Sequence, residues 1–339
     1  MSAVISKAPL RLGLAGGGTD LEPYCSDYGG VVLSATIDQY AYCKVESDDD
    51  WIFKSIDLDL EERFEFLPND YVEDHPLKLL INTYLYLVNK SIFKSPVKIT
   101  TYCETPPGSG LGSSSAVVVS LIAALAEHLS VPMGEYDIAK SAFEIERNIC
   151  KLPGGKQDQF AAAFGGFNYI EFFKGEQTIV NPLRLNYKVQ NMLEMNTVLY
   201  YVGKPRKDAR VIETNMNNLK SDSKSIQATH KIKKACENFK VRLLTGDVKG
   251  ISDLMNDYWK LKLKTSDKIG SDELMEVYDY ALQHGATAAK ISGAGGGGHM
   301  ILFTEFENRH RLISALNKRD TGRVVPFKFV KHGVDVWRQ

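Results

Sequence analysis

Hydrophobic and polar positions alternate in several short stretches of the first half of the chain, and this period predicts strands. The clearest stretch, Val97-Lys98-Ile99-Thr100-Thr101-Tyr102, is followed by an apolar run, Ala116–Leu129, that predicts a buried helix. Further strands are expected over residues 3–14, Val31–Lys44, a hairpin at Trp51–Leu67, Asn168–Phe173 and Thr178–Pro182. Further helices are expected over Pro76–Asn89 and Tyr136–Lys151, with a short one inside the loop Gly154–Gly166.

The pattern changes near residue 186, where a second, helix-rich half begins. Its expected strands are Thr197–Val202, Ala288–Ile291, Met300–Thr304 and Val324–Lys331. A polar, basic loop follows the first of these strands, and helices are expected over 224–245, 248–264, 272–284 and Glu307–Lys318. Strands and helices are interspersed without regular βαβ spacing, which predicts an α+β chain of two lobes, 1–186 and 187–339, with the site between them.

The composition narrows the class of protein. The 339 residues are 44% hydrophobic and 24% charged, as in a globular protein, and the net charge of −1 argues against a nucleic-acid binder. The five cysteines are scattered without a C-x-x-C pair, so neither a zinc site nor a disulfide framework is indicated. Because no leader and no membrane-spanning run stands out, we expect a cytoplasmic protein that binds no membrane.

A glycine-rich loop lies between the predicted strand at 97–102 and the predicted helix at 116–129. It reads Pro106-Pro107-Gly108-Ser109-Gly110-Leu111-Gly112-Ser113-Ser114-Ser115. Glycines permit close backbone approach, and a helix N-terminus offers free N–H groups and a positive dipole end, which suits a phosphate. The alternative is an ordinary tight turn with a serine cap. The loop matches neither G-x-x-x-x-G-K-[ST] nor the Rossmann pattern, whose third glycine is replaced by Ser113.

Two further glycine clusters stand near the ends of the chain. The first is Leu14-Ala15-Gly16-Gly17-Gly18-Thr19-Asp20, preceded by Lys7-Ala8-Pro9-Leu10-Arg11, and the second is Ser292-Gly293-Ala294-Gly295-Gly296-Gly297-Gly298. Each alone is compatible with a structural turn. The three clusters in this order resemble the signature motifs of the GHMP small-molecule kinases, and the resemblance runs from about residue 5 to 330.

The resemblance implies a two-lobed fold, with an N-terminal lobe like the second domain of ribosomal protein S5 and a ferredoxin-like C-terminal lobe. It also implies that ATP lies with its phosphates over the middle loop. The residues expected to bind these phosphates are Pro107, Gly108, Ser109, Gly110, Leu111, Gly112, Ser113, Ser114 and Ser115. Ser114 matches the family position that coordinates Mg²⁺.

Two carboxylates complete the expected catalytic group. Glu146 lies at the border of an apolar helical stripe, where it would be either a Mg²⁺ ligand, as the resemblance implies, or a surface residue paired with a neighbouring base. Asp158 is expected at a helix N-terminus, as a simple cap or, by resemblance, as the group that takes the proton from the attacking hydroxyl. Arg11 matches a position where many family members carry a lysine beside this aspartate, and it could orient Asp158 or the phosphoryl group.

The first motif is similar to the branch of the family with D-glycero-D-manno-heptose 7-phosphate kinases and L-fucokinase-type enzymes. The residues then expected to contact substrate are Gly17, Gly18, Thr19, Asp20, Gly155, Lys156, Gly295 and Gly296. The basic run Lys204–Arg210, through Arg206 and Arg210, either holds a distal phosphate of the sugar or is a solvated loop.

The resemblance therefore implies an ATP- and Mg²⁺-dependent kinase for the anomeric hydroxyl of D-glycero-D-manno-heptose 7-phosphate, giving the 1,7-bisphosphate for surface glycans. The alternatives are a kinase for an unphosphorylated sugar such as L-fucose and a non-catalytic sugar-sensing relative. A sensor would be expected to lack Asp158 or Glu146, and both are present. The expected assembly is a monomer or homodimer.

Overall fold

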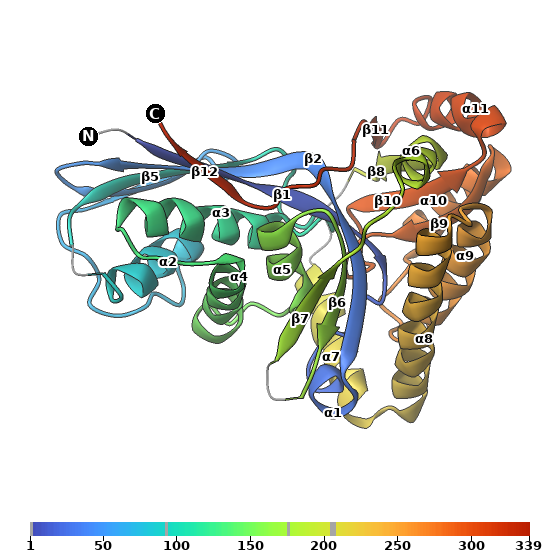
Figure 1. Ribbon diagram of the computed structural model, residues 1–339, viewed down its shortest axis with the longest axis horizontal. Helices are drawn as coiled ribbons and strands as arrows, with labels where there is room; N and C mark the ends of the chain where they lie inside the picture. Colours follow the sequence, from blue (N-terminus) through green and yellow to red (C-terminus); the bar gives the residue numbers. More distant parts are fainter. Residues whose placement is uncertain (1–2, 92–93, 175–176, 204–207) are drawn as a thin grey trace.

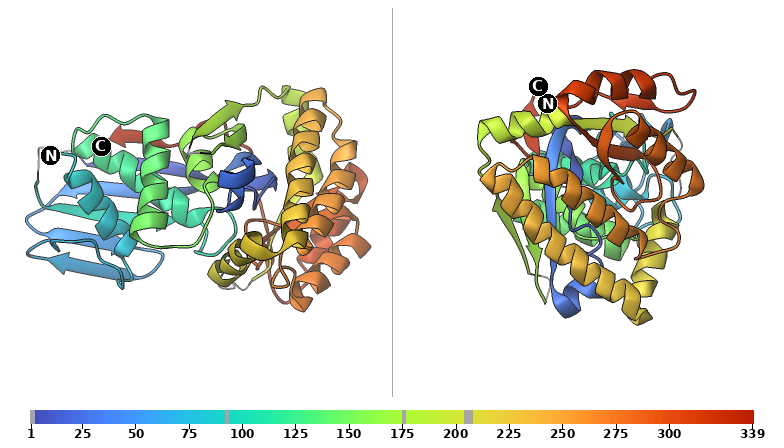
Figure 2. Two further views of the ribbon diagram at one scale, coloured as in Figure 1. Left: turned by 90° about the horizontal axis from the view of Figure 1, so that it is seen from below. Right: turned by 90° about the vertical axis from the view of Figure 1, so that its right-hand side faces the viewer.

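The chain folds into two lobes that lie side by side along the long axis of the molecule (Figure 1). The computed structural model describes residues 3–91, 94–174, 177–203 and 208–339. Both ends of the described chain lie on the N-terminal lobe, as Figure 2 shows in two further views. Within the described part of the chain, no helix combines the length and the apolar character needed to cross a membrane.

The N-terminal lobe is built on an eight-stranded sheet. Its strands are β1 (Val4–Ala15), β2 (Gly30–Ser47), β3 (Trp51–Ser55), β4 (Leu60–Phe64), β5 (Val97–Cys103), β6 (Phe167–Phe172), β7 (Thr178–Pro182) and β12 (Asp335–Arg338). The strand order is β12-β1-β2-β5-β3-β4, and β6 pairs with both β2 and β7. The long β2 pairs with β5 through Ala41–Ser47 and with β6 through Gly30–Ala35. Opposite β2, the register of β1 shifts between Pro9 and Leu10, where proline lacks the N–H that a regular ladder needs.

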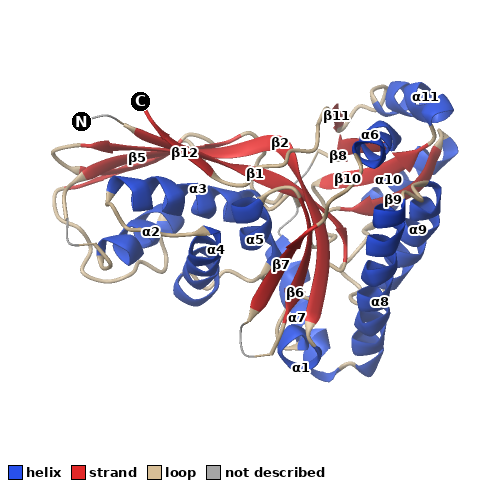
Figure 3. Cartoon of the chain, viewed as in Figure 1, coloured by secondary structure: helices blue, strands red, loops and turns tan. Residues whose placement is uncertain are grey.

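Helices cover one face of this sheet (Figure 3). They are α2 (Lys78–Val88), α3 (Ser113–His128), α4 (Glu135–Phe143), the π-helical segment η1 (Glu144–Ile149) and α5 (Gln157–Phe164), whereas the short α1 (Tyr24–Tyr28) lies apart from them at the start of β2. The central helix is α3, which packs against β1 and β2 and against α2, α4 and α5. It is apolar on all sides, as a helix in the middle of a core is expected to be. The phosphate-loop candidate is therefore anchored to the most buried helix of the lobe.

The C-terminal lobe has a four-stranded antiparallel sheet in the order β11-β8-β10-β9. Its strands are β8 (Thr197–Tyr201), β9 (Ala286–Ile291), β10 (His299–Thr304) and β11 (Arg323–Val325). Its helices are α6 (Tyr187–Asn196), α7 (Asp208–Ser221), α8 (Ser223–Thr245), α9 (Lys249–Leu263), α10 (Asp272–Gln283) and α11 (Phe306–Leu316). The chain order, strand, helices, two strands, helix, strand, is that of a ferredoxin-like unit, which confirms the expected lobe type.

Two expectations about the second half were wrong. The polar stretch after β8 is helical from Asp208 onward as α7, because its apolar residues, including the buried Val211 and Leu219, recur at helical spacing. The last expected strand, Val324–Lys331, is reduced to the three residues of β11.

The end of the chain returns to the N-terminal lobe. Val330 N–H donates to the carbonyl of Thr36 at 3.0 Å, and β12 then pairs antiparallel with β1. The C-terminal lobe therefore ends before β12, not at residue 339 as the sequence pattern suggested.

Candidate active site

The middle glycine-rich loop joins β5 to α3 with three left-handed residues. Gly108, Gly110 and Gly112 have φ of 75°, 75° and 76°, a region that other residues adopt only at a cost of about 1–2 kcal/mol each. Gly112 is the N-cap residue of α3. The alternating glycines therefore turn the backbone sharply and leave the first N–H groups of a sixteen-residue helix facing the loop.

The late glycine cluster packs directly on this loop. A Cβ atom on Gly110 would lie 2.5 Å from the carbonyl oxygen of Ser292, and one on Gly293 would lie 2.9 Å from Cα of Gly110. Ser292 Oγ donates to the Gly110 carbonyl at 2.8 Å. These glycines allow two backbone segments to approach closely, so the C-terminal lobe packs against the phosphate-loop candidate and supports it.

His299 also supports the loop, through its ring and its backbone. His299 N–H donates to the Ser109 carbonyl at 3.0 Å, and Nδ1 lies 2.8 Å from the same oxygen. Burial lowers the pKa of His299 to about 4, so the ring is neutral near pH 7 and Nδ1–H is the donor. His299 therefore has a structural role at the loop.

Two serines of the loop connect to a buried carboxylate. Ser114 Oγ donates to Glu146 Oε1 at 3.0 Å, and Ser115 Oγ donates to Oε2 at 2.7 Å. Gln159 Nε2 also donates to Oε2. Glu146 is fully buried, deeper than the border position that its helical spacing predicted. The reason is that Glu144–Ile149 is π-helical, and its wider turn changes the direction of each side chain.

Asp158 and Arg11 form an ion pair beside the phosphate-loop candidate. Arg11 Nε donates to Asp158 Oδ1 at 2.7 Å, and its Nη2 lies 2.6 Å from the same oxygen. Arg11 Nη1 donates to the carbonyl of Gly110 at 2.6 Å. Asp158 lies in the first turn of α5, as expected, with 21% of its side chain exposed. One arginine thus holds both the carboxylate and the loop in place.

Asp20 marks the other end of the site. Its carboxylate accepts from Gly18 N–H at 3.0 Å and from Gln157 Nε2 at 3.1 Å. Gln157 N–H also donates to it, at 3.2 Å. A Cβ atom on Gly155 would overlap this carboxylate, so glycine is required there for Asp20 to fit. Asp20 is therefore held in a fixed position beside Gln157, which directly precedes Asp158 in the chain.

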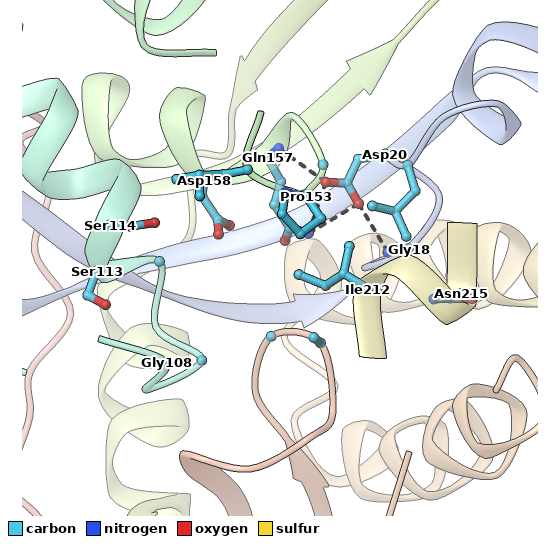
Figure 4. A pocket seen from close by; sticks show the side chains of 18 of the residues that line it. Gly18, Asp20, Gly108, Ser113, Ser114, Pro153, Gln157, Asp158, Ile212 and Asn215 are labelled. Atoms are coloured by element: carbon cyan, nitrogen blue, oxygen red, sulfur yellow. Dashed lines mark hydrogen bonds between the residues drawn. The ribbon is translucent and has the colours of Figure 1, made fainter. Parts of the chain in front are cut away.

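Arg11, Asp20 and Asp158 line one cleft of about 590 Å³ between the lobes, together with residues of the middle loop, whereas Glu146 is buried and is not among the lining residues. Figure 4 shows Ser113 and Ser114 at one end, Asp158 in the middle, and Asp20, Gly18 and Asn215 at the other end. The size is that of an ordinary small-molecule site. The arrangement places residues of the phosphate-loop candidate, a carboxylate with its arginine and a polar end in one row.

Some residues expected to contact substrate have other surroundings. Thr19 is fully buried, and its hydroxyl bonds to the backbone of Gly16 and Val31. Lys156 pairs with Glu22 at 2.8 Å and lines a different hollow. These three bonds of Thr19 stabilise the turn of the first motif.

Three expected residues of the C-terminal lobe, Gly295, Gly296 and Arg210, do not line the cleft. Gly293 and Ala294 line the cleft, whereas Gly296 lines another pocket and the missing Cβ of Gly295 faces Ile269. Arg210 is exposed on α7 and does not line the cleft. Arg206 lies outside the described residues.

Four polar residues of the cleft wall were not predicted from the sequence. They are Arg147, Gln157, Asn215 and Lys262. Arg147 Nε donates to the carbonyl of Gly155 at 3.3 Å, and its guanidinium fills the space that a Cβ of Gly154 would need. Arg147 and Gln157 adjoin motifs that were identified, so proximity along the chain was an available signal.

The other two missed residues, Asn215 and Lys262, come from α7 and α9. Lys262 Nζ donates to the Gly17 carbonyl at 2.9 Å. Burial lowers the pKa of Lys262 to about 8, and the charge of Asp20 opposes that shift. Nothing in their sequence neighbourhoods signals a site.

The phosphate loop, the paired Asp158 and Arg11 and the two-lobed fold define a class of small-molecule kinase. The chain belongs to the GHMP kinase family: residues 78–166 match the GHMP kinases N-terminal domain and residues 232–320 match the GHMP kinases C-terminal domain. The expected fold class and family are thereby confirmed.

Individual relatives are similar over the whole length. The chain is 41% identical to D-glycero-alpha-D-manno-heptose 7-phosphate kinase of Campylobacter jejuni, covering 100% of both chains. A crystal structure described as a D-glycero-D-manno-heptose 1-phosphate kinase from Bacteriodes thetaiotaomicron is 36% identical, with a TM-score of 0.84 and 99% of each chain covered. The mevalonate kinase of Methanococcus jannaschii, at 21% identity and a TM-score of 0.73 over 96% of this chain and 98% of its own, shares the fold.

Proposed function

We propose that the protein transfers the γ-phosphoryl group of ATP to the anomeric hydroxyl of D-glycero-D-manno-heptose 7-phosphate, giving the 1,7-bisphosphate. The observation that carries the proposal is the single cleft in which the phosphate loop, Asp158 and Asp20 follow one another. The full-length similarity to a heptose 7-phosphate kinase supports this acceptor.

The proposal includes a magnesium ion next to the phosphate loop. Mg²⁺ prefers hard oxygen ligands and binds through one or two carboxylates together with substrate phosphates. The hydroxyl of Ser114 lines the cleft and donates to Glu146, so its lone pairs are free to face a cation. Ser114 and Glu146 therefore fit the ion, which would neutralise charge on the β- and γ-phosphates.

The protein groups would act mainly by alignment. The N-terminus of α3 and the loop Gly108–Gly112 hold the phosphates through backbone N–H groups. Asp158 faces the anomeric O–H and accepts its proton as O1 forms a bond to the γ-phosphorus and the bond to the bridging oxygen breaks, releasing ADP. Arg11 pairs with Asp158 and fixes its orientation through two contacts to one oxygen.

Asp20 would fix the sugar. It accepts from Gly18 and Gln157 in this structure, and its remaining lone pairs can accept from sugar hydroxyls in the cleft. Buried hydroxyls need such partners, because an unpaired polar group is costly. The proposed location is the cytoplasm, in agreement with five cysteines that are all buried and free.

The test is ATP-dependent ADP release with a panel of acceptors. The panel is heptose 7-phosphate, heptose 1-phosphate, dephosphorylated heptose, L-fucose and galactose. The proposal expects kcat/KM to be highest for heptose 7-phosphate. Preferred turnover of heptose 1-phosphate would place the attack at O7, as the description of the Bacteriodes structure would suggest. Turnover of L-fucose alone would favour a fucokinase, a class represented by an Arabidopsis thaliana relative at 22% identity over 88% of this chain and 29% of its own.

A protein that binds ATP and sugar without turnover of any acceptor would fit the sensing alternative. The position of Asp158 in the cleft, paired with Arg11, and the hydrogen bond of the buried Glu146 with Ser114 support catalysis over sensing. Product identification by mass spectrometry and phosphorus NMR would locate the new phosphate on the sugar.

A further inference from the structure

Two helices of the C-terminal lobe close the end of the cleft that lies away from the phosphate loop. Asn215 of α7 and Lys262 of α9 line this end together with Ile212 and Gly18. A Cβ atom on Gly18 would lie 2.9 Å from Lys262 Nζ and 3.7 Å from Asn215 Nδ2. The two polar groups are therefore neighbours around one glycine of the first motif.

The amide of Asn215 can accept a hydrogen bond that no described residue donates to it. The side chain is 4% exposed, and Oδ1 is buried with no hydrogen-bond partner among the described residues. A buried amide oxygen without a partner is costly, and in a cleft wall a bound ligand or a water can supply the missing hydrogen bond. The amide carries both an acceptor and two donors, which suits a sugar hydroxyl that donates and accepts.

The ammonium of Lys262 can also donate more hydrogen bonds than it does in this structure. It is 4% exposed, and the Gly17 carbonyl is its one hydrogen-bond acceptor in the described part of the chain. An ammonium has three donors, so two remain for a ligand. A buried cation beside a neutral carbonyl is poorly compensated, and only the nearby Asp20 offsets its charge.

The other cations of the cleft already have partners. Arg11 is paired with Asp158 and with the Gly110 carbonyl. Arg147 donates to the carbonyl of Gly155 and lies 3.7 Å from Glu146. Among the cations that line the described cleft, Lys262 is thus the one that contacts no carboxylate directly.

We infer that Lys262 and Asn215 form the acceptor-recognition wall, in which Lys262 pairs with the phosphate that the sugar already carries and Asn215 hydrogen-bonds a sugar hydroxyl. The inference rests on the proposed function and deepens it, because it assigns the selection of a phosphorylated sugar to α7 and α9. It places the distal anion inside the cleft and not on the basic run that ends at Arg210.

The arrangement has a simple physical consequence. An anion that enters the cleft beside Lys262 compensates a buried positive charge, whereas a neutral sugar does not. The wall therefore favours a phosphorylated sugar over its dephosphorylated form. Asn215 contributes equally to both, since both carry the hydroxyls.

The experiment compares heptose 7-phosphate with dephosphorylated heptose in Lys262→Met and Asn215→Ala. Lys262→Met keeps the length and burial of the side chain but removes the charge. We expect it to lower kcat/KM for the phosphorylated sugar by about 10- to 100-fold, the range for a charge-assisted hydrogen bond, with no comparable loss for the neutral sugar. Asn215→Ala is expected to lower both values by about 3- to 10-fold. The KM for ATP should stay unchanged in both variants.

Matched controls are available on the same helices. Lys260 on α9 and Asn217 on α7 are exposed, so Lys260→Met and Asn217→Ala should behave as the wild type. Lys262→Arg retains a cation and should restore part of the preference for the phosphorylated sugar. Thermal unfolding of each variant separates a folding defect from a binding defect.

The outcomes distinguish the inference from the function it rests on. If the wild type phosphorylates no heptose phosphate, the proposed function fails. If the wild type does so and Lys262→Met keeps the same preference for the phosphorylated over the neutral sugar, the assignment of Lys262 is overturned while the function stands. Equal loss on both sugars, not rescued by Lys262→Arg, would also overturn it.

Discussion

The two ends of the cleft are built in different ways. The phosphate end is one contiguous loop, Gly108–Ser115, whose glycines and serines can be recognised in the sequence. The opposite end combines Asp20, which belongs to the first glycine motif, with Asn215 and Lys262, which are far from it in the chain. A site made by local backbone geometry leaves a local signature, whereas Asn215 and Lys262 reach the cleft only through tertiary packing. Variants at each end test whether the two ends act independently.

The largest effect is expected where the two ends meet, at Asp158. Asp158→Asn removes the proton acceptor and the charge paired with Arg11 but keeps the shape, so kcat should fall by about 10²–10⁴-fold with little change in ATP affinity. Steady-state kinetics and calorimetric titration with ATP measure the two quantities. A variant that retained nearly full activity would refute the catalytic role.

The phosphate end should respond to Gly110→Ala. The change introduces a Cβ 2.5 Å from the Ser292 carbonyl at a φ of 75°. We expect the free energy of unfolding to fall by more than about 1 kcal/mol, with a raised KM for ATP in the folded protein. Chemical denaturation and ATP kinetics provide the measurements.

A matched glycine tests whether the Gly110 effect is local. Gly134 has an ordinary φ of −88°, and an added Cβ would lie 3.7 Å from the nearest other side-chain atom, Asp137 Oδ2. Gly134→Ala should therefore leave the KM for ATP unchanged. If both variants altered ATP kinetics equally, the special geometry of the loop would not be the cause.

The acceptor end should show a pH dependence that the phosphate end lacks. Burial lowers the pKa of Lys262 to about 8, against the opposing charge of Asp20. Below this pH the ammonium is charged and attracts an anionic sugar, and above it the amine is neutral. For heptose 7-phosphate, kcat/KM should therefore fall above pH 8 by about tenfold per unit, because kcat/KM reports the free enzyme.

Other groups near Lys262 must be separated from it. Lys290, whose pKa burial lowers to about 7, donates to the carbonyls of Gly13 and Leu14 and is a second candidate for a titration. Lys262→Arg cannot lose its charge in this range, so it should abolish the fall above pH 8. A profile that stays the same in Lys262→Arg would assign the titration elsewhere.

The smallest effect is expected on the surface of α7. Arg210 is exposed and does not line the cleft, so Arg210→Ala should change the KM for heptose 7-phosphate by less than about twofold. Initial-rate kinetics at low ionic strength would reveal any weak attraction. A large rise in KM would restore the basic run after β8 as a phosphate-binding segment.

Much of the site could be predicted from the sequence, and the exceptions have physical reasons. The loop was identified from its glycines and from the resemblance to the GHMP kinases, and Asp158 was expected at a helix N-terminus, where it lies. The burial of Glu146 did not, because a π-helical turn changes the side-chain direction that regular spacing implies. Thr19 was expected to bind substrate, but its hydroxyl bonds to the backbone of Gly16 and Val31, which only the folded turn reveals.

The fold, too, could be predicted only where the sequence carries a local pattern. Strands with clear alternation were identified, and so were α8, α9 and α10 as helices. The short β12 has four residues and is a strand because it pairs with β1, so no local sequence pattern predicts it. Asn215 and Lys262 were missed because helical spacing explains why their segments are helices but does not show which side chains line the cleft.

The return of the chain to β1 means that the lobes are joined twice. One connection runs from β7 into α6, and the other runs from β11 to β12. The second connection also contacts α6, because Phe329 N–H donates to Glu194 Oε2 at 3.1 Å. A single cut by a protease in either connection would leave the lobes tethered through the other.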